Sequence, residues 1–521
     1  MARDLITPEP QPPCPERELT PEPSAGSSGR SDARTGRTSR TASPFRTGVA
    51  GRTGSALGAE TADRTGVRLG EAAGAPHGSP ALALVAALLG FFVVSLDASI
   101  VSVALPAIGG ELHGGLTALQ WVVDGYTLAL AALMLSTGAL SDRVGAGRAF
   151  CGGVVLFTAA SAACGLAPGL AVLVGARVVQ GAAAAVVLPS SLALVRQAFP
   201  DAAGRGRAIS LWAAGGSVAV ALGPVAGGAL TSAWSWRGIF FVNLPVGAVA
   251  LLLAARTGRS PRRRTPLDLP GQATAVVALA ALTYAVIEGG RAGLLAGAVA
   301  AVAFAGFLRI ESRHPHPVVP LGLFGERALT VSLAAGAAVS FAFFGAFFAL
   351  SLYFQQVRGE SALTTGLLFL PMTMLISSVN VISGKAADRY GPRAPMAVGQ
   401  AVAAGGLLLL LTAGAGTPSV LVALAMIPFG AGAAFAVPAL TAAAMGAVAA
   451  ERAGMAAGLL NACRQVAAGL SVAVFGSLVS GTPHGFRLAG LHEGFAAAAL
   501  LLALTAGFAL RASSHPPRPA P

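Results

Sequence analysis

The sequence is poor in charge, cysteine and lysine. Charged residues make up only 11% of its 521 residues, whereas 54% are hydrophobic, and this balance is typical of a polytopic membrane protein rather than a soluble one. The four cysteines are scattered without a C-x-x-C pair, so we expect neither a metal centre nor a disulfide framework. The single lysine, Lys385, precedes Ala386, which excludes the G-x-x-x-x-G-K-[ST] loop of a self-contained ATP-driven pump.

The apolar segments also lack the groups that an enzyme would require. No His–Glu–His or Cys–His grouping lies within them, so we expect no enzyme active site, no metal and no cofactor. Aromatic residues make up only 6% of the chain, and most arginines lie between the apolar segments. The net charge of +13 therefore agrees with the positive-inside rule for membrane proteins, and we expect no nucleic-acid partner.

The chain divides into a polar tail and a long apolar region. Residues 1–80 are rich in proline, glycine, serine, threonine and arginine, which predicts a disordered cytoplasmic tail. From residue 81 to 511, apolar runs of about 20 residues alternate with short polar breaks, as in a chain that crosses the bilayer repeatedly. We predict fourteen transmembrane helices, at 81–104, 118–140, 149–167, 170–193, 207–230, 238–255, 271–289, 293–310, 328–353, 364–385, 394–413, 418–442, 455–478 and 493–511. Residues 512–521 would form a short second tail.

The distribution of arginines predicts how these helices are oriented. Most of them lie in alternate polar breaks, and five of them gather at 256–264. Because basic loops are retained in the cytoplasm, these breaks and both termini are predicted to be cytoplasmic. The expected location is therefore the cytoplasmic cell membrane, which the chain crosses many times.

One loop motif occurs twice, 246 residues apart. Residues 138–148 read GALSDRVGAGR, and residues 384–393 read GKAADRYGPR. Each copy starts with a glycine, ends its helix with an acid–base pair, and then has a glycine that permits a tight turn. These residues are Gly138, Asp142, Arg143 and Gly145 in the first copy, and Gly384, Asp388, Arg389 and Gly391 in the second. A single copy would be an ordinary charged loop, whereas two copies at equivalent loops predict two similar halves.

The distance between the two copies also predicts an insertion. The copies are eight predicted spans apart, although a plain duplication of a six-helix unit would require six. We therefore predict six-helix halves at 81–255 and 328–511, with a linker and two inserted helices at 256–327. A second repeat, QGAAAAVVLP at 180–189 and FGAGAAFAVP at 429–438, supports the duplication.

The motifs resemble those of the major facilitator superfamily over about residues 81–510. The matching motifs are G-x-L-x-D-R-x-G at 138–145, R-x-x-Q-G at 177–181 and G-P-x-x-G-G at 223–228. The match is closest to the fourteen-span drug:proton antiporter subfamily. Its markers resemble LDASIVSVALP at 96–106, QWVVDGY at 120–126 and WRGIFFVNLP at 236–245.

The resemblance implies both a fold and a function. The fold would be an all-α polytopic membrane protein with two pseudo-symmetric six-helix halves, two inserted helices and a central cavity that opens alternately to each side. The function would be export of lipophilic drugs or antibiotics in exchange for protons, by a monomer that uses the proton gradient and no cofactor. The alternatives are a dedicated exporter of an endogenous secondary metabolite and a non-transporting membrane sensor.

Two carboxylates within the apolar runs are candidates for proton coupling. Asp97 lies well inside the first predicted span, where a carboxylate is costly and rare. It would bind and release a proton during transport, or else it is a structural acid that bonds locally with Ser95 and Ser99. Asp124 lies in the second span and is either a second proton site or a solvated acid near the outer end of its helix.

Four further polar residues are candidates for the cavity. Arg177 is matched by Met426 in the second half, so the charge occurs in one half only. It either pairs with a cavity acid, as the resemblance implies, or extends from the helix end to the lipid headgroups. Gln180 lies one turn away on the same face. Asn461 and Arg464 lie in the thirteenth span and complete the set.

The fifth span carries a ladder of small residues. Gly215, Ala219, Gly223 and Gly227 recur every four residues, which lets helix backbones approach closely. By resemblance this is the antiporter helix, with the motif residues Gly223, Pro224, Gly227 and Gly228. Six phenylalanines crowd the ninth span at 341–354, and we interpret them as a packing or lipid-facing stripe rather than as a drug pocket.

Overall fold

The computed structural model describes residues 79–257, 260, 268–314, 317, 319, 321–449, 452–482 and 485–511. The predicted tails at 1–78 and 512–521, and most of the predicted linker at 258–267, lie outside these residues. The described chain is almost entirely helical. A helix satisfies its own backbone hydrogen bonds, as a segment in lipid must.

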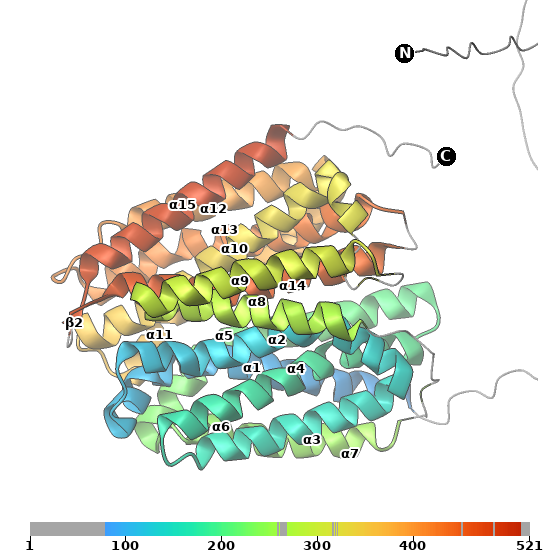
Figure 1. The fold of residues 1–521 in the computed structure, drawn as a ribbon, viewed down its shortest axis with the longest axis horizontal. Helices are drawn as coiled ribbons and strands as arrows, with labels where there is room; N and C mark the ends of the chain where they lie inside the picture. The colour runs from blue at the N-terminus through green and yellow to red at the C-terminus, as the bar shows by residue number, and fades with distance from the viewer. Residues whose placement is uncertain are drawn as a thin grey trace, which may run out of the picture. The chain divides into compact units, whose positions relative to one another are not determined.

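Five long helices and one broken helix form the first half (Figure 1). The long helices are α1 (Pro80–Leu112), α2 (Leu116–Val144), α3 (Ala146–Gly165), α4 (Leu170–Ala198) and α5 (Ala202–Ala233). The sixth predicted span is divided into α6 (Gly238–Phe241) and α7 (Asn243–Ala254). Pro245 explains the break, because proline has no N–H to donate to the Phe241 carbonyl one turn earlier.

Six helices form the second half. They are α10 (Arg327–Leu352), α11 (Ala362–Tyr390), α12 (Arg393–Leu410), α13 (Ser419–Gly446), α14 (Ala453–Val479) and α15 (Leu488–Arg511). A π-helical turn, η2 (Tyr353–Val357), continues α10. A short antiparallel hairpin of β1 (Ser480–Thr482) and β2 (Gly485–Phe486) joins α14 to α15, and no sequence pattern predicts this hairpin.

The two halves pack through equivalent pairs of helices. In the first half α5 packs on α1 and α4 packs on α2 and α3; in the second half α14 packs on α10 and α13 packs on α11 and α12. Between the halves α2 contacts α14 and α5 contacts α11. Since α11 is the equivalent of α2 and α14 is the equivalent of α5, the two contacts are related by exchanging the halves. This exchange is what a two-fold pseudo-symmetry axis between the halves produces.

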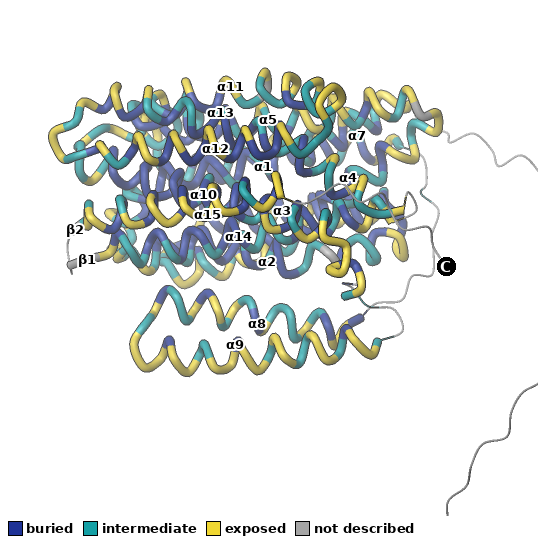
Figure 2. The backbone as a smooth tube through the Cα atoms, turned by 90° about the horizontal axis from the view of Figure 1, so that it is seen from above, coloured by how far each residue is buried: buried dark blue, intermediate teal, exposed yellow. Residues whose placement is uncertain are grey.

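Two inserted helices lie beside this bundle. They are α8 (Leu269–Glu288) and α9 (Gly290–Glu311), and the 3-10 turn η1 (Leu321–Gly325) follows them. Figure 2 shows the pair next to α2 and α14, with α9 largely exposed. Gln272 of α8 donates to the Ala132 carbonyl and accepts from Ser136 Oγ, both on α2. The insert is therefore attached to the bundle through α8.

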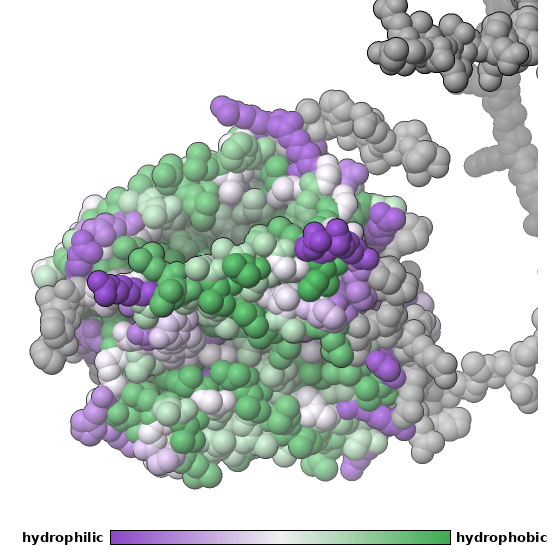
Figure 3. All heavy atoms as spheres, in the orientation of Figure 1, coloured by the Kyte–Doolittle hydropathy of each residue, from purple (hydrophilic) through white to green (hydrophobic). Residues whose placement is uncertain are grey.

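The outer surface has the pattern expected of a membrane protein. Figure 3 shows mostly hydrophobic side chains over the middle of one face and hydrophilic side chains gathered toward the two ends of the helices. Thirteen described helices are long and apolar enough to cross a membrane, and the shorter apolar segment Gly238–Ala254 adds another. The predicted fold class, an all-α membrane protein with fourteen spans, is confirmed.

Several helices extend beyond their predicted spans. The first predicted span covers 81–104, whereas α1 has 33 residues and ends at Leu112. The fifth is predicted from 207, but α5 begins at Ala202, because the Asp201 side chain accepts the Gly204 N–H at 2.6 Å and caps the helix. Hydropathy marks only the part of a helix inside the bilayer, so it underestimates helices that project into water.

Candidate functional site

Asp97 and Arg177 form a buried ion pair between α1 and α4. Arg177 Nη1 lies 2.5 Å from Asp97 Oδ2, and the two side chains are 1% and 0% exposed. On α4, one turn from Arg177, the backbone also packs closely on α2: a Cβ on Gly181 would lie 2.2 Å from the Tyr126 carbonyl. Such a pair offsets the cost of burial only if further hydrogen bonds satisfy both groups.

Amide side chains supply those further bonds. Gln180 Nε2 and Asn243 Nδ2 donate to Asp97 Oδ1 at 2.9 and 2.8 Å. Arg177 also donates to Gln180 Oε1 at 2.8 Å and, through Nε, to the Val122 carbonyl at 3.1 Å. We call Asp97, Arg177, Gln180 and Asn243 the Asp97 network. The Asp97 carboxylate thus accepts hydrogen bonds from three side chains.

The aromatic ring of Tyr126 covers the other side of the arginine. The Arg177 guanidinium carbon lies 4.2 Å from the centre of this ring, at the distance of a cation–π contact. The interpretation of Arg177 as a residue that reaches the headgroups is therefore wrong, and it pairs with a buried acid instead. Ser99 bonds to the carbonyls of Ser95 and Leu96 rather than to Asp97.

Asn243 is the member of the Asp97 network that the sequence analysis does not single out. It is the first residue of α7, directly after the break in the sixth span, and it also donates to Ser161 Oγ at 3.0 Å. The available signal is an amide within an apolar segment, five residues after a glycine and two before a proline.

Asp124 lies apart from the Asp97 network, at the contact between the halves. Its side chain is fully buried, so the interpretation as a solvated helix-end acid is wrong. Oδ1 lies 3.5 Å from Thr127 Oγ1, and Oδ2 has no hydrogen-bond partner among the described residues. Gln120, one turn earlier on α2, donates to the Ala473 carbonyl of α14 at 3.0 Å. Asp124 is thus a buried carboxyl without a cation, on a helix that joins the two halves.

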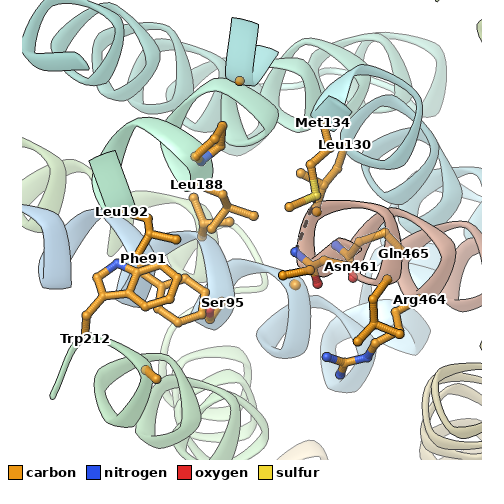
Figure 4. Close-up of a pocket in the computed structure, with 18 of the residues that line it drawn as sticks. Phe91, Ser95, Leu130, Met134, Leu188, Leu192, Trp212, Asn461, Arg464 and Gln465 are labelled. Atoms are coloured by element: carbon orange, nitrogen blue, oxygen red, sulfur yellow. Dashed lines mark hydrogen bonds between the residues drawn. The ribbon is translucent and has the colours of Figure 1, made fainter. Parts of the chain in front are cut away.

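A cavity of about 930 Å³ lies between the halves. Helices α1, α2, α4 and α5 line it from the first half and α10, α13 and α14 from the second (Figure 4). Its volume is at the upper end of the range for small-molecule sites. Ser95, Ala98 and Ser99 of α1 face the cavity, and Asp97, in the same turn, joins the enclosed network instead. The turn around Asp97 therefore connects the cavity to the Asp97 network.

Aromatic side chains form two walls of this cavity. Phe91 and Trp212 stack with their ring centres 4.1 Å apart and lie together in Figure 4. Phe343, Phe344 and Phe347 of α10 line the cavity as well. These three residues therefore line the cavity as well as packing against one another.

The polar wall of the cavity belongs to α14. Asn461, Arg464 and Gln465 recur at the spacing of one helix face, and Figure 4 shows them across the cavity from Phe91 and Trp212. Asn461 Nδ2 lies 3.5 Å from Met134 Sδ, and Arg464 Nε donates to Ser340 Oγ at 3.2 Å. The structure thus places the predicted residues Asn461 and Arg464 in the cavity.

The cavity reaches the end of the bundle that carries the two loop motifs. Gly138 and Asp142 line it there, and Asp142 is exposed. The glycines that end α2 and α11, Gly145 and Gly391, have φ values of 98° and 75°, as the tight turns require. The mouth of the cavity is therefore at this end of the bundle.

Small residues close the opposite end. A Cβ on Gly223 would lie 1.9 Å from Ser99 Oγ, so α5 and α1 are in direct backbone contact there. On the other face of α5, a Cβ on Gly228 would lie 2.3 Å from the Ala362 carbonyl of α11, and a Cβ on Gly366 would lie 2.3 Å from the Pro224 carbonyl. The predicted antiporter helix, which also contains Gly227, forms this seal between the halves.

Comparison with known proteins identifies the family. Residues 87–472 match the family model of the Major Facilitator Superfamily. The chain belongs to this superfamily. The predicted family is therefore confirmed, and the protein is a multi-pass membrane transporter rather than an enzyme.

Curated members of the superfamily are similar to most of this chain. The multidrug resistance protein Stp of Mycobacterium tuberculosis is 40% identical over 408 residues, 77% of this chain and 76% of that protein. The methylenomycin A resistance protein of Streptomyces coelicolor is 37% identical over 435 residues, 81% of this chain and 92% of that protein. The tetracenomycin C resistance and export protein of Streptomyces glaucescens is 34% identical over 419 residues, 78% of this chain and 77% of that protein.

Solved structures of the superfamily agree in fold. An inward-facing, unoccupied bacterial homologue of the human lysosomal transporter Spinster superposes with a TM-score of 0.61 at 19% identity, over 83% of this chain and 96% of that chain. A peptide transporter, POT, in complex with sulfate superposes with a TM-score of 0.63 at 17% identity, over 84% of this chain and 94% of that chain.

Proposed function

We propose that the protein exports lipophilic drugs or antibiotics across the cytoplasmic membrane by proton-coupled antiport. The relatives named for multidrug, methylenomycin A and tetracenomycin C resistance support the substrate class. The observation that carries the coupling is the position of Asp97 beside a cavity of about 930 Å³, in the same turn as the lining residues Ser95, Ala98 and Ser99. Movement of α1 around a substrate would also move the Asp97 network.

The Asp97 network explains how a proton would be released. In the state described, Arg177 and two amides bind the Asp97 carboxylate. In the opposite state the pair separates, and a buried carboxylate that loses its cation takes up a proton. Re-forming the pair with Arg177 then expels this proton. Because the described state opens on the side of the loop motifs, the proton leaves toward that side.

Asp124 is proposed as the second proton site. It has no cationic partner and one long contact to a hydroxyl, so it carries its proton in this state, since an unpaired buried charge is costly. The contact of α2 with α14 must change when the halves rock, and the surroundings of Asp124 change with it.

The arginine distribution assigns the open end to the cytoplasm. The loops at 138–148 and 384–393 carry basic residues and lie at the open end of the cavity, so the positive-inside rule places both termini and the cavity mouth in the cytoplasm. Substrate would enter from there or from the inner leaflet. One chain encloses the whole cavity, so a monomer suffices.

Transport into inverted vesicles tests this function. In such vesicles the cytoplasmic side faces out, and an acidic lumen provides the gradient that drives antiport. We expect vesicles containing the protein to accumulate a lipophilic antibiotic several-fold over empty vesicles, and nigericin to abolish the difference. Accumulation that persists without a pH gradient would contradict antiport.

The same assay, run over a panel of compounds, distinguishes a broad drug exporter from a dedicated exporter. Two relatives are each named for resistance to a single antibiotic, which favours a dedicated exporter. Uptake of several unrelated compounds would support a multidrug exporter. Uptake of one compound alone would support a dedicated exporter of a secondary metabolite.

A further inference from the structure

In the interior of the cavity lies an arginine, Arg464, that no carboxylate among the described residues neutralises. Among the described residues Arg464 takes part in none of the ion pairs, and its only hydrogen bond runs from Nε to Ser340 Oγ. Its stem packs against Gly336, where a Cβ would lie 3.2 Å from Arg464 Cγ. The stem and Nε are thus fixed by α10, and the terminal nitrogens Nη1 and Nη2 remain available to a ligand.

The rest of the lining does not compensate for this charge. Of the charged side chains that the structure describes, three line the cavity, namely Asp142, Arg196 and Arg464. Asp142 and Arg196 are exposed at the mouth, near the ends of α2 and α4. Asp97 is enclosed and already paired with Arg177. The interior of the cavity is therefore positive, which favours an anion and disfavours a cation in a site of low dielectric.

The residues around Arg464 also indicate what shape of anion the cavity would bind. Asn461 and Gln465, on the same helix face, bring amide groups that can bond an oxygen beside the guanidinium. Phe91 and Trp212 across the cavity, together with the α10 phenylalanines, offer flat apolar surfaces. An aromatic ring between these walls would place an attached acidic group at the guanidinium.

We propose that Arg464 anchors the acidic group of an aromatic substrate, so that the cavity takes aromatic acids in their anionic form in preference to neutral or cationic compounds. This inference rests on the proposed export function and specifies its substrate class. An arginine bonds a carboxylate or an ionised phenol with charge-assisted hydrogen bonds, and often with two of them. A lipophilic cation would meet the same guanidinium as a like charge.

Binding of three matched probes tests the proposal. The probes share one ring system: anthracene-2-carboxylate, its neutral carboxamide and the corresponding trimethylammonium compound. Calorimetric titration of the full chain in nanodiscs at pH 7.5 should give the tightest binding for the carboxylate, by at least about 10-fold over the carboxamide. Arg464→Gln should remove this preference and leave carboxamide binding within about 2-fold. Arg464→Lys keeps the charge but not the paired donors, and should retain part of the preference.

Controls separate a binding role from a structural one. Arg291→Gln removes an exposed arginine on α9 that does not line the cavity, and it should leave all three affinities unchanged. Equal loss of carboxylate and carboxamide binding in Arg464→Gln would overturn the proposal, because the residue would then only support the fold. Equal or tighter binding of the carboxamide or the ammonium probe to the unmodified protein would overturn it as well, and so would no binding of any probe.

Failure of the inference and failure of the proposed function are distinguishable. A protein that prefers the carboxylate through Arg464, yet accumulates no antibiotic under a pH gradient, would contradict antiport and leave the anionic subsite standing. A protein that accumulates antibiotics but binds the three probes alike would contradict only the subsite.

Discussion

At the scale of single residues, Arg177 and Arg464 have opposite surroundings. Arg177 is enclosed with Asp97, Gln180, the Val122 carbonyl and the Tyr126 ring, so its charge is used entirely within the protein. Arg464 has one hydroxyl partner and faces the cavity. The first arginine therefore suits control of a proton, and the second suits contact with a ligand.

The Asp97–Arg177 pair makes a prediction about stability. Removing one partner of a buried pair leaves an uncompensated charge, which costs about 3–5 kcal/mol, whereas removing both costs much less. We expect Arg177→Gln to lower the apparent unfolding temperature in detergent clearly, and Asp97→Asn with Arg177→Gln to restore most of the loss. The measurement is thermal unfolding of the purified variants, with Arg291→Gln as the surface control. Additive losses in the double variant would contradict the pairing.

Polar residues in apolar segments can be recognised in the sequence, but their partners cannot. Asp97, Arg177 and Gln180 are conspicuous because charge and amide groups are rare within spans. Their convergence with Asn243 depends on how α1, α4 and α7 pack, and asparagine in a short apolar segment is not conspicuous by itself. For the same reason, Arg464 could be assigned to the cavity, whereas its bond to Ser340 of α10 could not.

At the scale of helices, α5 makes close contacts on two of its faces. Its glycines approach α1 on one face and α11 on the other, at Gly223 and Gly228 respectively. Opening of the closed end requires α5 and α11 to separate. The seal therefore depends on residues without side chains at these crossings.

A matched pair of substitutions tests this seal. In Gly366→Ala the new methyl group would lie 2.3 Å from the Pro224 carbonyl, whereas Gly405 of α12 has open space around it. We expect Gly366→Ala to push the halves apart at the closed end and to reduce transport at least several-fold. Gly405→Ala should be neutral or slightly stabilising, because alanine favours helix.

The accessibility of a cysteine introduced at Ser95 would report whether Gly366→Ala opens the closed end of the cavity. In a background without the natural cysteines, an impermeant maleimide should label Ser95→Cys from the outside faster in Gly366→Ala than in Gly405→Ala. Equal labelling of both variants would show that the α5–α11 contact does not form the seal.

Helices could be predicted from the sequence much better than their ends. A run of about 20 apolar residues identifies a span, so every predicted span corresponds to a helix. Caps such as Asp201 extend helices into water, and Pro245 divides the sixth span. The β1–β2 hairpin was missed because no alternation of polar and apolar residues marks its short strands.

At the scale of the whole molecule, duplication explains most of the architecture. The repeated loop motifs predict two halves, and the helix pairs that contact each other are equivalent in both. The sequence cannot predict which state the molecule adopts, because this depends on small differences between the two interfaces. In the described state α5 seals against α11, and the cavity opens beside Asp142.

The central claim is that Asp97 couples substrate export to proton entry through its pair with Arg177. The most direct measurement is proton movement from acid-loaded inverted vesicles when a transported compound is added. Comparing the unmodified protein with Asp97→Asn, and with Glu493→Gln as the control at an exposed side chain of α15, isolates this residue. The account predicts proton release from the unmodified protein and the control, and none from Asp97→Asn. Equal release from all three would contradict the role of Asp97 and assign the coupling to Asp124.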